Sequence, residues 1–299
     1  MYSRFLSQRL NRYLGVNGKS VWGPRAAELG IEALRGHQPV ATSVIDFAEN
    51  SFPNATALAA TTLSATVTEV GVVADNAIVC NAYNGYMLVT PGSAADTGYG
   101  IQFLKTDVSP EFGMGFAPAT AIDTVERAVY LYWGARIAIS TSAAWDGAIS
   151  FGIWGSDTTP LSTTTGLPTV TSGIMFNFDN TGTLRINKAV SASNANTTLA
   201  PTATTLAHSS SSYRARDFHD YFFRAKWMAL GGGAATNQAV EAFLDGKLLG
   251  TINGLSLPAI ATSTMYNSLA VYNGDAATVT LACTEIINGY QRWTVGTDR

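Results

Sequence analysis

Apolar and polar residues alternate along much of this chain, in short runs that are separated by turn residues. The alternation is clearest from Tyr221 to Leu230, where aromatic and apolar residues are interleaved with charged ones as in a half-buried strand. Three glycines at 231–233 permit the backbone to reverse into a second run, Gln238 to Leu244. Asp245-Gly246 then predicts a type I′ turn into Lys247 to Ile252, because both central residues of that turn need positive φ. The stretch therefore predicts three consecutive antiparallel strands.

The same stretch carries a short motif. An aromatic strand containing an arginine is followed by a glycine-rich loop and by a strand that ends in Asp-Gly, with a further Gly after it. The residues of this motif are Tyr221, Phe223, Ala225, Val240, Ala242, Phe243, Asp245, Gly246 and Gly250. The motif resembles the C-terminal half of concanavalin A-like and laminin-G-like jelly-roll domains. The resemblance implies a jelly-roll β-sandwich, and a fold by itself implies no activity.

Other runs with the composition of strands fill most of the chain after His37. The longest apolar tract, Val125 to Ser140, is rich in β-branched and aromatic residues and predicts a central strand bent at Gly134. Further strands are expected at 62–68, 77–81, 86–90, 98–105, 149–155, 174–178, 184–187, 268–272, 279–284 and 285–295. About a dozen short strands with frequent turn signals predict an all-β fold, an antiparallel jelly-roll β-sandwich.

One long segment departs from this pattern. Residues 189–213 carry no formal charge if His208 is neutral, and they consist mostly of Ser, Thr, Ala and Asn. Such low-complexity composition predicts a long loop, either mobile or ordered only against a neighbouring subunit.

The first 36 residues differ from the rest in the spacing of their apolar residues. Apolar residues recur there at helical spacing, and Pro24 to Gly36 predicts a second helical piece. Neither helix is long enough to be stable alone in water, so each needs a surface, on its own chain, on another subunit or on a membrane. We therefore divide the chain into a basic helical N-terminal arm, 1–36, and a jelly-roll domain, 37–299. The residues of the arm expected to bind a partner are Arg4, Phe5, Arg9, Leu10, Arg12 and Tyr13.

Charge is sparse and unevenly placed. Only 13% of residues are charged, about half of what a soluble domain usually carries. Residues 1–35 have a net charge of +4 and the remainder −7, within a total of −3, which does not favour nucleic-acid binding. Arginines interrupt any apolar signal region near the N-terminus, and no apolar stretch is long enough to span a membrane, so synthesis and folding in a cytoplasm are expected.

Candidate chemistry is scarce. The carboxylates are scattered instead of paired as glycoside hydrolysis needs, and the three histidines lie beside no nucleophile motif, so no enzymatic activity is expected. Cys80 and Cys283 are expected to be buried thiols, with a bridge between them as the alternative. No cofactor is expected except calcium, for which Asp179-Asn180 or Asn273 to Asp275 could supply oxygens, although turn formation explains those residues equally well.

Aromatic residues near strand ends are candidates for stacking on sugar rings, with burial in the core as the alternative. They are Trp145, Trp154, Trp227 and Tyr266.

The whole chain resembles tailed-phage virion proteins that carry lectin-like jelly rolls. This resemblance implies a virion structural protein, a capsid decoration or cement subunit, whose partners are the major capsid protein and copies of itself. Its location would be the exterior of the capsid, after synthesis in the host cytoplasm. The alternative is a carbohydrate-binding, lectin-like host-recognition domain of a phage tail fibre, with surface glycans as the partner.

Overall fold

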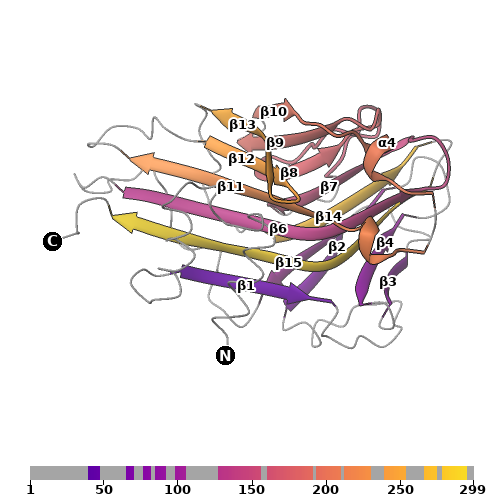
Figure 1. Ribbon diagram of the computed structural model, residues 1–299, viewed down its shortest axis with the longest axis horizontal. Coiled ribbons are helices and arrows are strands. Elements are labelled where there is room, and N and C mark those ends of the chain that lie inside the picture. Colours follow the sequence, from indigo (N-terminus) through magenta and orange to yellow (C-terminus); the bar gives the residue numbers. More distant parts are fainter. Residues whose placement is uncertain are drawn as a thin grey trace.

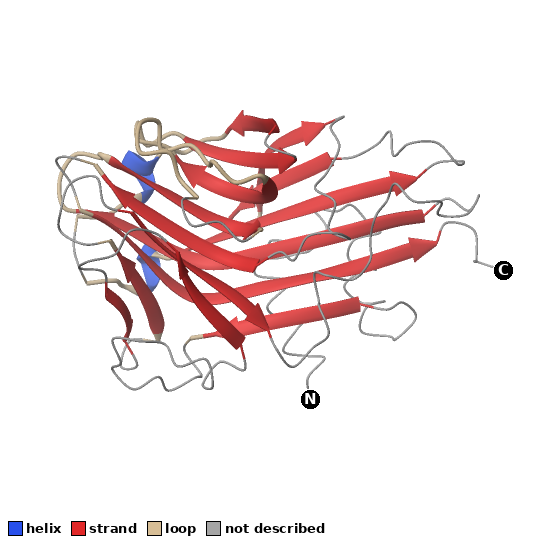
Figure 2. Cartoon of the chain, turned by 180° about the vertical axis from the view of Figure 1, so that it is seen from behind, coloured by secondary structure: helices blue, strands red, loops and turns tan. Residues whose placement is uncertain are grey.

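Two antiparallel β-sheets packed face to face make up the fold (Figure 1). The computed structural model describes residues 40–47, 65–70, 77–81, 85–91, 98–105, 127–155, 160–190, 193–209, 212–229, 239–253, 266–274 and 278–294. Within these ranges the regular structure is nearly all strand, and the two short helices lie at one end of the sandwich (Figure 2). The all-β, antiparallel β-sandwich predicted from the sequence is therefore confirmed.

The first sheet, sheet A, has the order β13-β12-β11-β6-β15-β4-β3, and β1 pairs with the free length of β15. Its strands are β1 Val40–Asp46, β3 Ala77–Asn81, β4 Tyr86–Thr90, β6 Arg127–Thr141, β11 His219–Ala229, β12 Ala239–Leu244, β13 Lys247–Asn253 and β15 Val279–Thr294. The long apolar tract is indeed central, because β6 lies between β11 and β15.

The second sheet, sheet B, has the order β10-β9-β8-β7-β14-β5-β2. Its strands are β2 Ala65–Val70, β5 Gly98–Lys105, β7 Gly147–Trp154, β8 Ser172–Phe178, β9 Leu184–Val190, β10 Ser193–Thr198 and β14 Tyr266–Asn273. A helical turn, α4 (Ala203–Leu206), follows β10, and a 3₁₀ turn, η1 (Ala215–Asp217), precedes β11.

The turn residues behave as their chemistry predicts. Asp245 and Gly246 have φ of 49° and 77°, so the hairpin between β12 and β13 has the positive φ values expected of a type I′ turn. Gly85 and Gly182 also have positive φ, at the turns before β4 and before β9. The Gly182 N–H donates to the carbonyl of Asp179 at 2.8 Å, which closes the predicted turn between β8 and β9.

The main core lies between the two sheets and is rich in aromatic rings. Trp133 of β6 stacks between Phe151 of sheet B and Phe223 of sheet A, with ring centroids 6.2 and 5.7 Å away. Its indole Nε1–H donates to Oδ1 of Asn267, on β14 of the opposite sheet, at 3.1 Å. All of these residues are buried, so this hydrogen bond joins the two sheets inside the core.

Each sheet also has an apolar cluster on its outer face. On sheet B, Trp154, Met175 and Tyr272 are buried together with Leu161 and Val170 of a loop that crosses the strands. On sheet A, Tyr86, Ala138, Phe218 and Ala282 form the corresponding cluster.

Two expectations are corrected by the structure. Residues 189–213 do not form one loop: β9 runs to Val190, β10 follows at Ser193–Thr198, and α4 comes after it. The polar composition did not reveal β10, because β10 is an edge strand that backbone hydrogen bonds hold to β9 and on which Asn196 and Thr198 are exposed. The segments 279–284 and 285–295 are one strand, β15, whose register shifts between Cys283 and Glu285, so an extra residue bends the strand without ending it.

Some expectations fall on residues outside the described ranges. The N-terminal arm and its candidate partner-binding residues lie there, and so does the side chain of Cys80. Cys283 is a buried thiol outside any disulfide, as expected, and its Sγ–H donates to the Glu285 carbonyl at 3.4 Å. No helix within the described residues is long and apolar enough to cross a membrane.

Candidate functional site

A row of polar side chains crosses the outer face of sheet B. Residues alternate along each strand, so Phe176 of β8 and Ile186 of β9 face the core while their neighbours face outward. The strand register places the outward residues side by side, with Thr198 opposite Arg185, Arg185 opposite Asn177, and Asn177 opposite Ser150. A second row puts Asn196 opposite Asn187. We call these six residues, Ser150, Asn177, Arg185, Asn187, Asn196 and Thr198, the polar face.

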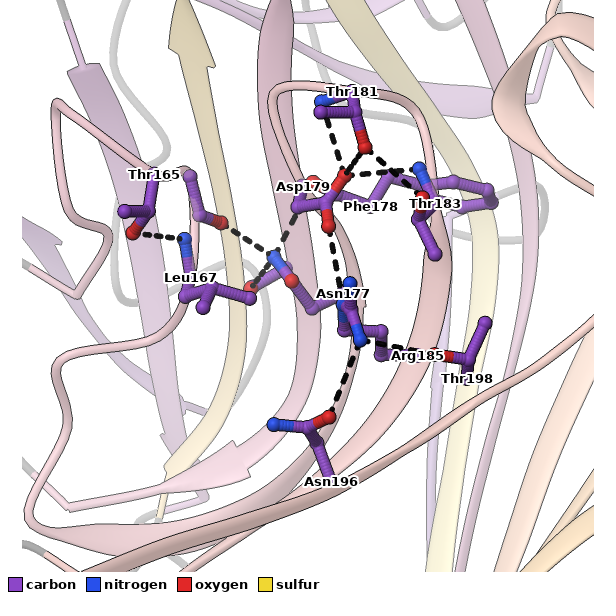
Figure 3. A network of polar contacts seen from close by, with 12 residues as sticks. Thr165, Leu167, Asn177, Phe178, Asp179, Thr181, Thr183, Arg185, Asn196 and Thr198 are labelled. Atoms are coloured by element: carbon purple, nitrogen blue, oxygen red, sulfur yellow. Dashed lines mark hydrogen bonds and ion pairs between the residues drawn. The ribbon is translucent and has the colours of Figure 1, made fainter.

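Asp179 organises one end of the polar face (Figure 3). Its Oδ1 accepts hydrogen bonds from the backbone N–H groups of Thr181 and Thr183, both at 3.0 Å, and from the Thr181 hydroxyl at 2.6 Å. Its Oδ2 accepts from Nε–H of Arg185 at 3.0 Å. One carboxylate therefore fixes both the turn between β8 and β9 and the arginine that follows it.

The electrostatics agree with this role. Burial alone would raise the pKa of Asp179, but the hydrogen bonds from Thr181, Thr183 and Arg185 stabilise the charged form and together hold the pKa below its ordinary value. Asp179 is therefore an anion at neutral pH, and it balances the charge of Arg185.

Arg185 is held in place by partners in the turn before β9 and on β10. Besides the bond to Asp179, its Nη1 donates to Oδ1 of Asn196 at 3.3 Å and to Oγ1 of Thr198 at 2.9 Å (Figure 3). Its side chain remains about a quarter exposed, at 25%, and Asn196 and Thr198 are exposed on the edge strand. We call Arg185, Asn196 and Thr198 the exposed half of the polar face.

The rest of the polar face is covered. Asn177 is fully buried, and its Nδ2 lies within hydrogen-bonding distance of Oγ of Ser150, at 3.1 Å, and of the Gly166 carbonyl, at 2.8 Å. Gly166 belongs to the loop that crosses sheet B. Asn187 is buried as well, between Arg185 and Ala189 on β9. We call Ser150, Asn177 and Asn187 the covered half.

The sugar-stacking candidates occupy different places. Trp145 is half-buried beside the Asp179 turn, where its Nε1–H donates to the Asp179 carbonyl at 2.8 Å. Trp154 and Tyr266 are register partners on β7 and β14, on the outer face of sheet B. Tyr266 is half-buried, but Trp154 is fully buried, so its indole offers no face to a ligand in this conformation. The side chain of Trp227 lies outside the description.

Asp275, one of the candidate calcium ligands, lies outside the described residues, and Asp179, Asn180 and Asn273 take part in hydrogen bonds. Both carboxylate oxygens of Asp179 accept hydrogen bonds, Asn180 Nδ2 donates to the Thr164 carbonyl at 2.9 Å, and Asn273 Oδ1 accepts from the Val279 N–H at 2.9 Å. Within the described residues, no three His, Cys, Asp or Glu side chains gather closely enough to hold a metal ion.

A second polar cluster, on sheet A, anchors the type I′ turn. His219 Nδ1 lies 2.8 Å from Oδ2 of Asp245, and the Asp220 N–H donates to Oδ1 of Asp245 at 2.9 Å. Arg136 pairs with Asp220 at 2.9 Å. Burial would raise the pKa of Asp245, but the hydrogen bonds from His219 and from the Asp220 N–H outweigh it and lower the pKa. The groups of this cluster bind one another, which suits a structural role.

The sequence alone did not identify Arg185, Asn196, Thr198 or Asn177. Arg185 stands three residues after Gly182, the end of the predicted turn, and the alternation of its strand was visible from Leu184 onward. The missing information was the partner strand, because β10 was expected to be loop. Without β10 nothing brings Asn196 and Thr198 to Arg185.

No protein-family model matches the chain, and no curated protein matches its sequence. Two solved structures similar in fold are the carbohydrate recognition domain of Emp47p (12% identity, 85% of this chain and 94% of that chain, TM-score 0.42) and the potassium-bound form of that of Emp46p (12%, 80% and 95%, TM-score 0.43). A third is the conserved carbohydrate esterase vb_24B_21 from the Shiga toxin-encoding bacteriophage phi24B (12%, 84% and 99%, TM-score 0.40). At these identities and TM-scores the likeness says nothing about function, and the assignment of a β-sandwich rests on the sheet topology itself.

Proposed function

We propose that this protein is a carbohydrate-binding β-sandwich that performs no chemistry on its ligand, and that the exposed half of the polar face contacts the glycan. The observation that carries the proposal is the fixed, partly exposed guanidinium of Arg185 between Asn196 and Thr198.

Fixed polar groups suit the recognition of sugar hydroxyls. A side chain that is already held in place loses little conformational entropy when a ligand binds, so each new hydrogen bond contributes more of its free energy to affinity. Arg185 keeps its shape through bonds from Nε and Nη1, and none of its bonds to described residues uses the two N–H groups of Nη2. The Asn196 amide and the Thr198 hydroxyl lie beside it on the exposed edge.

The charge balance favours neutral sugars over acidic ones. Bidentate recognition of a carboxylate needs two free parallel N–H groups on adjacent guanidinium nitrogens. In Arg185 the Nε–H is bonded to Asp179, and Nη1 is bonded to Asn196 and Thr198. A single hydroxyl oxygen fits the remaining nitrogen better, and the anionic Asp179 nearby disfavours a second anion.

An array of neutral and acidic oligosaccharides tests the proposal. We expect the wild-type protein to bind neutral oligosaccharides, and Asn196→Ala to weaken that binding by about tenfold, as the loss of one or two good hydrogen bonds does. Asn253→Ala is the matched control, because Asn253 is an exposed asparagine at the end of β13, the edge strand of the other sheet. Binding to no glycan, or equal losses in the two variants, would refute the assignment.

A second candidate function is the capsid decoration subunit that the sequence suggests. The observation that favours it is the low content of charged residues, 13%, together with a basic first segment on an acidic remainder. In this role the protein would sit on the exterior of a virion, against the major capsid protein and copies of itself. Deletion of residues 1–36 is then expected to give a folded protein that no longer joins particles, measured by co-sedimentation, and unchanged incorporation would contradict this role.

A further inference from the structure

A self-contained hairpin, residues 160–170, lies over the outer face of sheet B. Its own backbone bonds hold it together: the Ser162 N–H donates to the Leu167 carbonyl at 2.9 Å, and the Thr169 N–H donates to the Pro160 carbonyl at 3.0 Å. Where the chain leaves and rejoins the sheet, the Gly155 N–H donates to the Ser172 carbonyl at 3.0 Å. The backbone bonds within residues 160–170 therefore give the hairpin an internal frame, so that it can move as one unit.

Among the described residues, Asn177 and Asn180 bond the tip of the hairpin to the sheet. Asn180 donates from its backbone to the Thr165 carbonyl at 3.4 Å and from Nδ2 to the Thr164 carbonyl at 2.9 Å. Asn177 Nδ2 lies 2.8 Å from the Gly166 carbonyl. The approach is close at this point, because a Cβ on Gly166 would lie 2.6 Å from the Asn180 nitrogen. The tip is thus latched by two asparagines on one side of the sheet.

Some buried polar atoms of described residues near the hairpin have no hydrogen-bond partner. Within the part of the chain that is described, three buried side-chain atoms of the outer face have no hydrogen-bond partner: Nε1 of Trp154, Oδ1 of Asn177 and Nδ2 of Asn187. Buried polar atoms are nearly always paired, and an unpaired one costs free energy that a suitable partner would recover. The set contains two donors and one acceptor. A hydroxyl group can both accept and donate, so a hydroxyl-rich ligand can pair with all three.

We propose that the 160–170 hairpin is a hinged lid, and that the surface beneath it is the inner half of the glycan site, reached when the lid opens and a sugar ring lies against Trp154. The inference rests on the proposed function, because the exposed half of the polar face continues directly into the covered half: Arg185 is the register partner of Asn177, and Asn196 that of Asn187. The lid explains why Trp154, which stands at the end of β7 as a sugar-stacking residue would, is buried in the structure.

Hydroxyl-radical footprinting read by mass spectrometry tests the lid without any glycan. Trp154 and Met175 lie beneath the hairpin, and Trp133 is an equally buried reference in the core between the sheets. Asn180→Ala removes one latch bond and is expected to raise the oxidation of Trp154 and Met175 about fivefold, with Trp133 unchanged. Leu161→Ser removes apolar cover and is expected to raise it by roughly tenfold or more. Thr163→Ala, at an exposed position of the tip, is the control and should behave as wild type.

The same variants on the array of neutral oligosaccharides test the ligand. Asn180→Ala is expected to tighten binding several-fold, because less free energy is spent in opening the lid, whereas Thr163→Ala leaves it unchanged. Oxidation of Trp154 that is the same in all variants would overturn the lid. Faster oxidation with no gain in glycan binding would overturn the inner half of the site, and it would leave the exposed half to be judged by Asn196→Ala alone.

Discussion

Replacing Asp179 by Asn tests the network that fixes the polar face. The shape is preserved, but a single amide oxygen must serve the three donors of Thr181 and Thr183, so the new NH₂ group faces the Nε–H of Arg185. The variant loses one charge-assisted hydrogen bond, worth about 1.5–3 kcal/mol, and weakens three others. Because 25% of the Arg185 side chain is exposed and can be solvated by water, we expect a net loss of about 2–3 kcal/mol in the free energy of unfolding.

Urea denaturation followed by tryptophan fluorescence measures this loss. A double-mutant cycle of Asp179→Asn with Arg185→Met isolates the pair and is expected to give a coupling of about 1–2 kcal/mol. A coupling near zero, or a variant as stable as wild type, would show that the carboxylate does not hold the arginine.

Acid is expected to reduce the difference in stability between the wild-type protein and Asp179→Asn. Hydrogen bonds hold the pKa of Asp179 in the folded protein below its ordinary value, so its contribution to stability is complete above the unfolded pKa of about 4. That contribution is lost as the pH falls through the folded value. The stability difference between wild type and Asp179→Asn should therefore shrink below about pH 4 and stay constant from about pH 5 to 7. A difference that instead grows on acidification would contradict the lowered pKa.

Two further variants test the scaffold. Asn267→Leu leaves the buried Nε1–H of Trp133 without its partner on the opposite sheet, so we expect a loss of about 1–3 kcal/mol in urea unfolding, and no loss would show that the bond between the sheets is dispensable. Gly182→Ala places a side chain at φ +76°, 3.1 Å from Cβ of Ala203 and 3.2 Å from Cδ1 of Trp145, and should lower the free energy of unfolding by about 1–2 kcal/mol. An unchanged midpoint for Gly182→Ala would mean that the turn before β9 adapts freely.

The fold was predictable because local signals determine it. Asp245-Gly246 fixes its hairpin through positive φ, and the β-branched and aromatic composition of residues 125–140 marks the central strand. Strand β10 escaped prediction because a polar edge strand needs only one neighbour for its backbone bonds and carries little apolar signal. The sequence also did not predict that β15 is one continuous strand, because a one-residue bulge does not change the composition.

The site was less accessible to the sequence than the fold. Trp154 stands near a strand end, as expected, but only the structure shows that residues 160–170 cover it. Arg185, Asn196 and Thr198 become one surface only through the pairing of β9 with β10. Residue type indicates what a side chain can do, whereas long-range register decides which side chains meet.

A crystal structure of the protein soaked with a neutral oligosaccharide tests the central claim most directly. The account predicts a sugar ring against Arg185, Asn196 and Thr198 on the outer face of sheet B. A sugar bound on sheet A or at another edge of the sandwich, with this face empty, would contradict it.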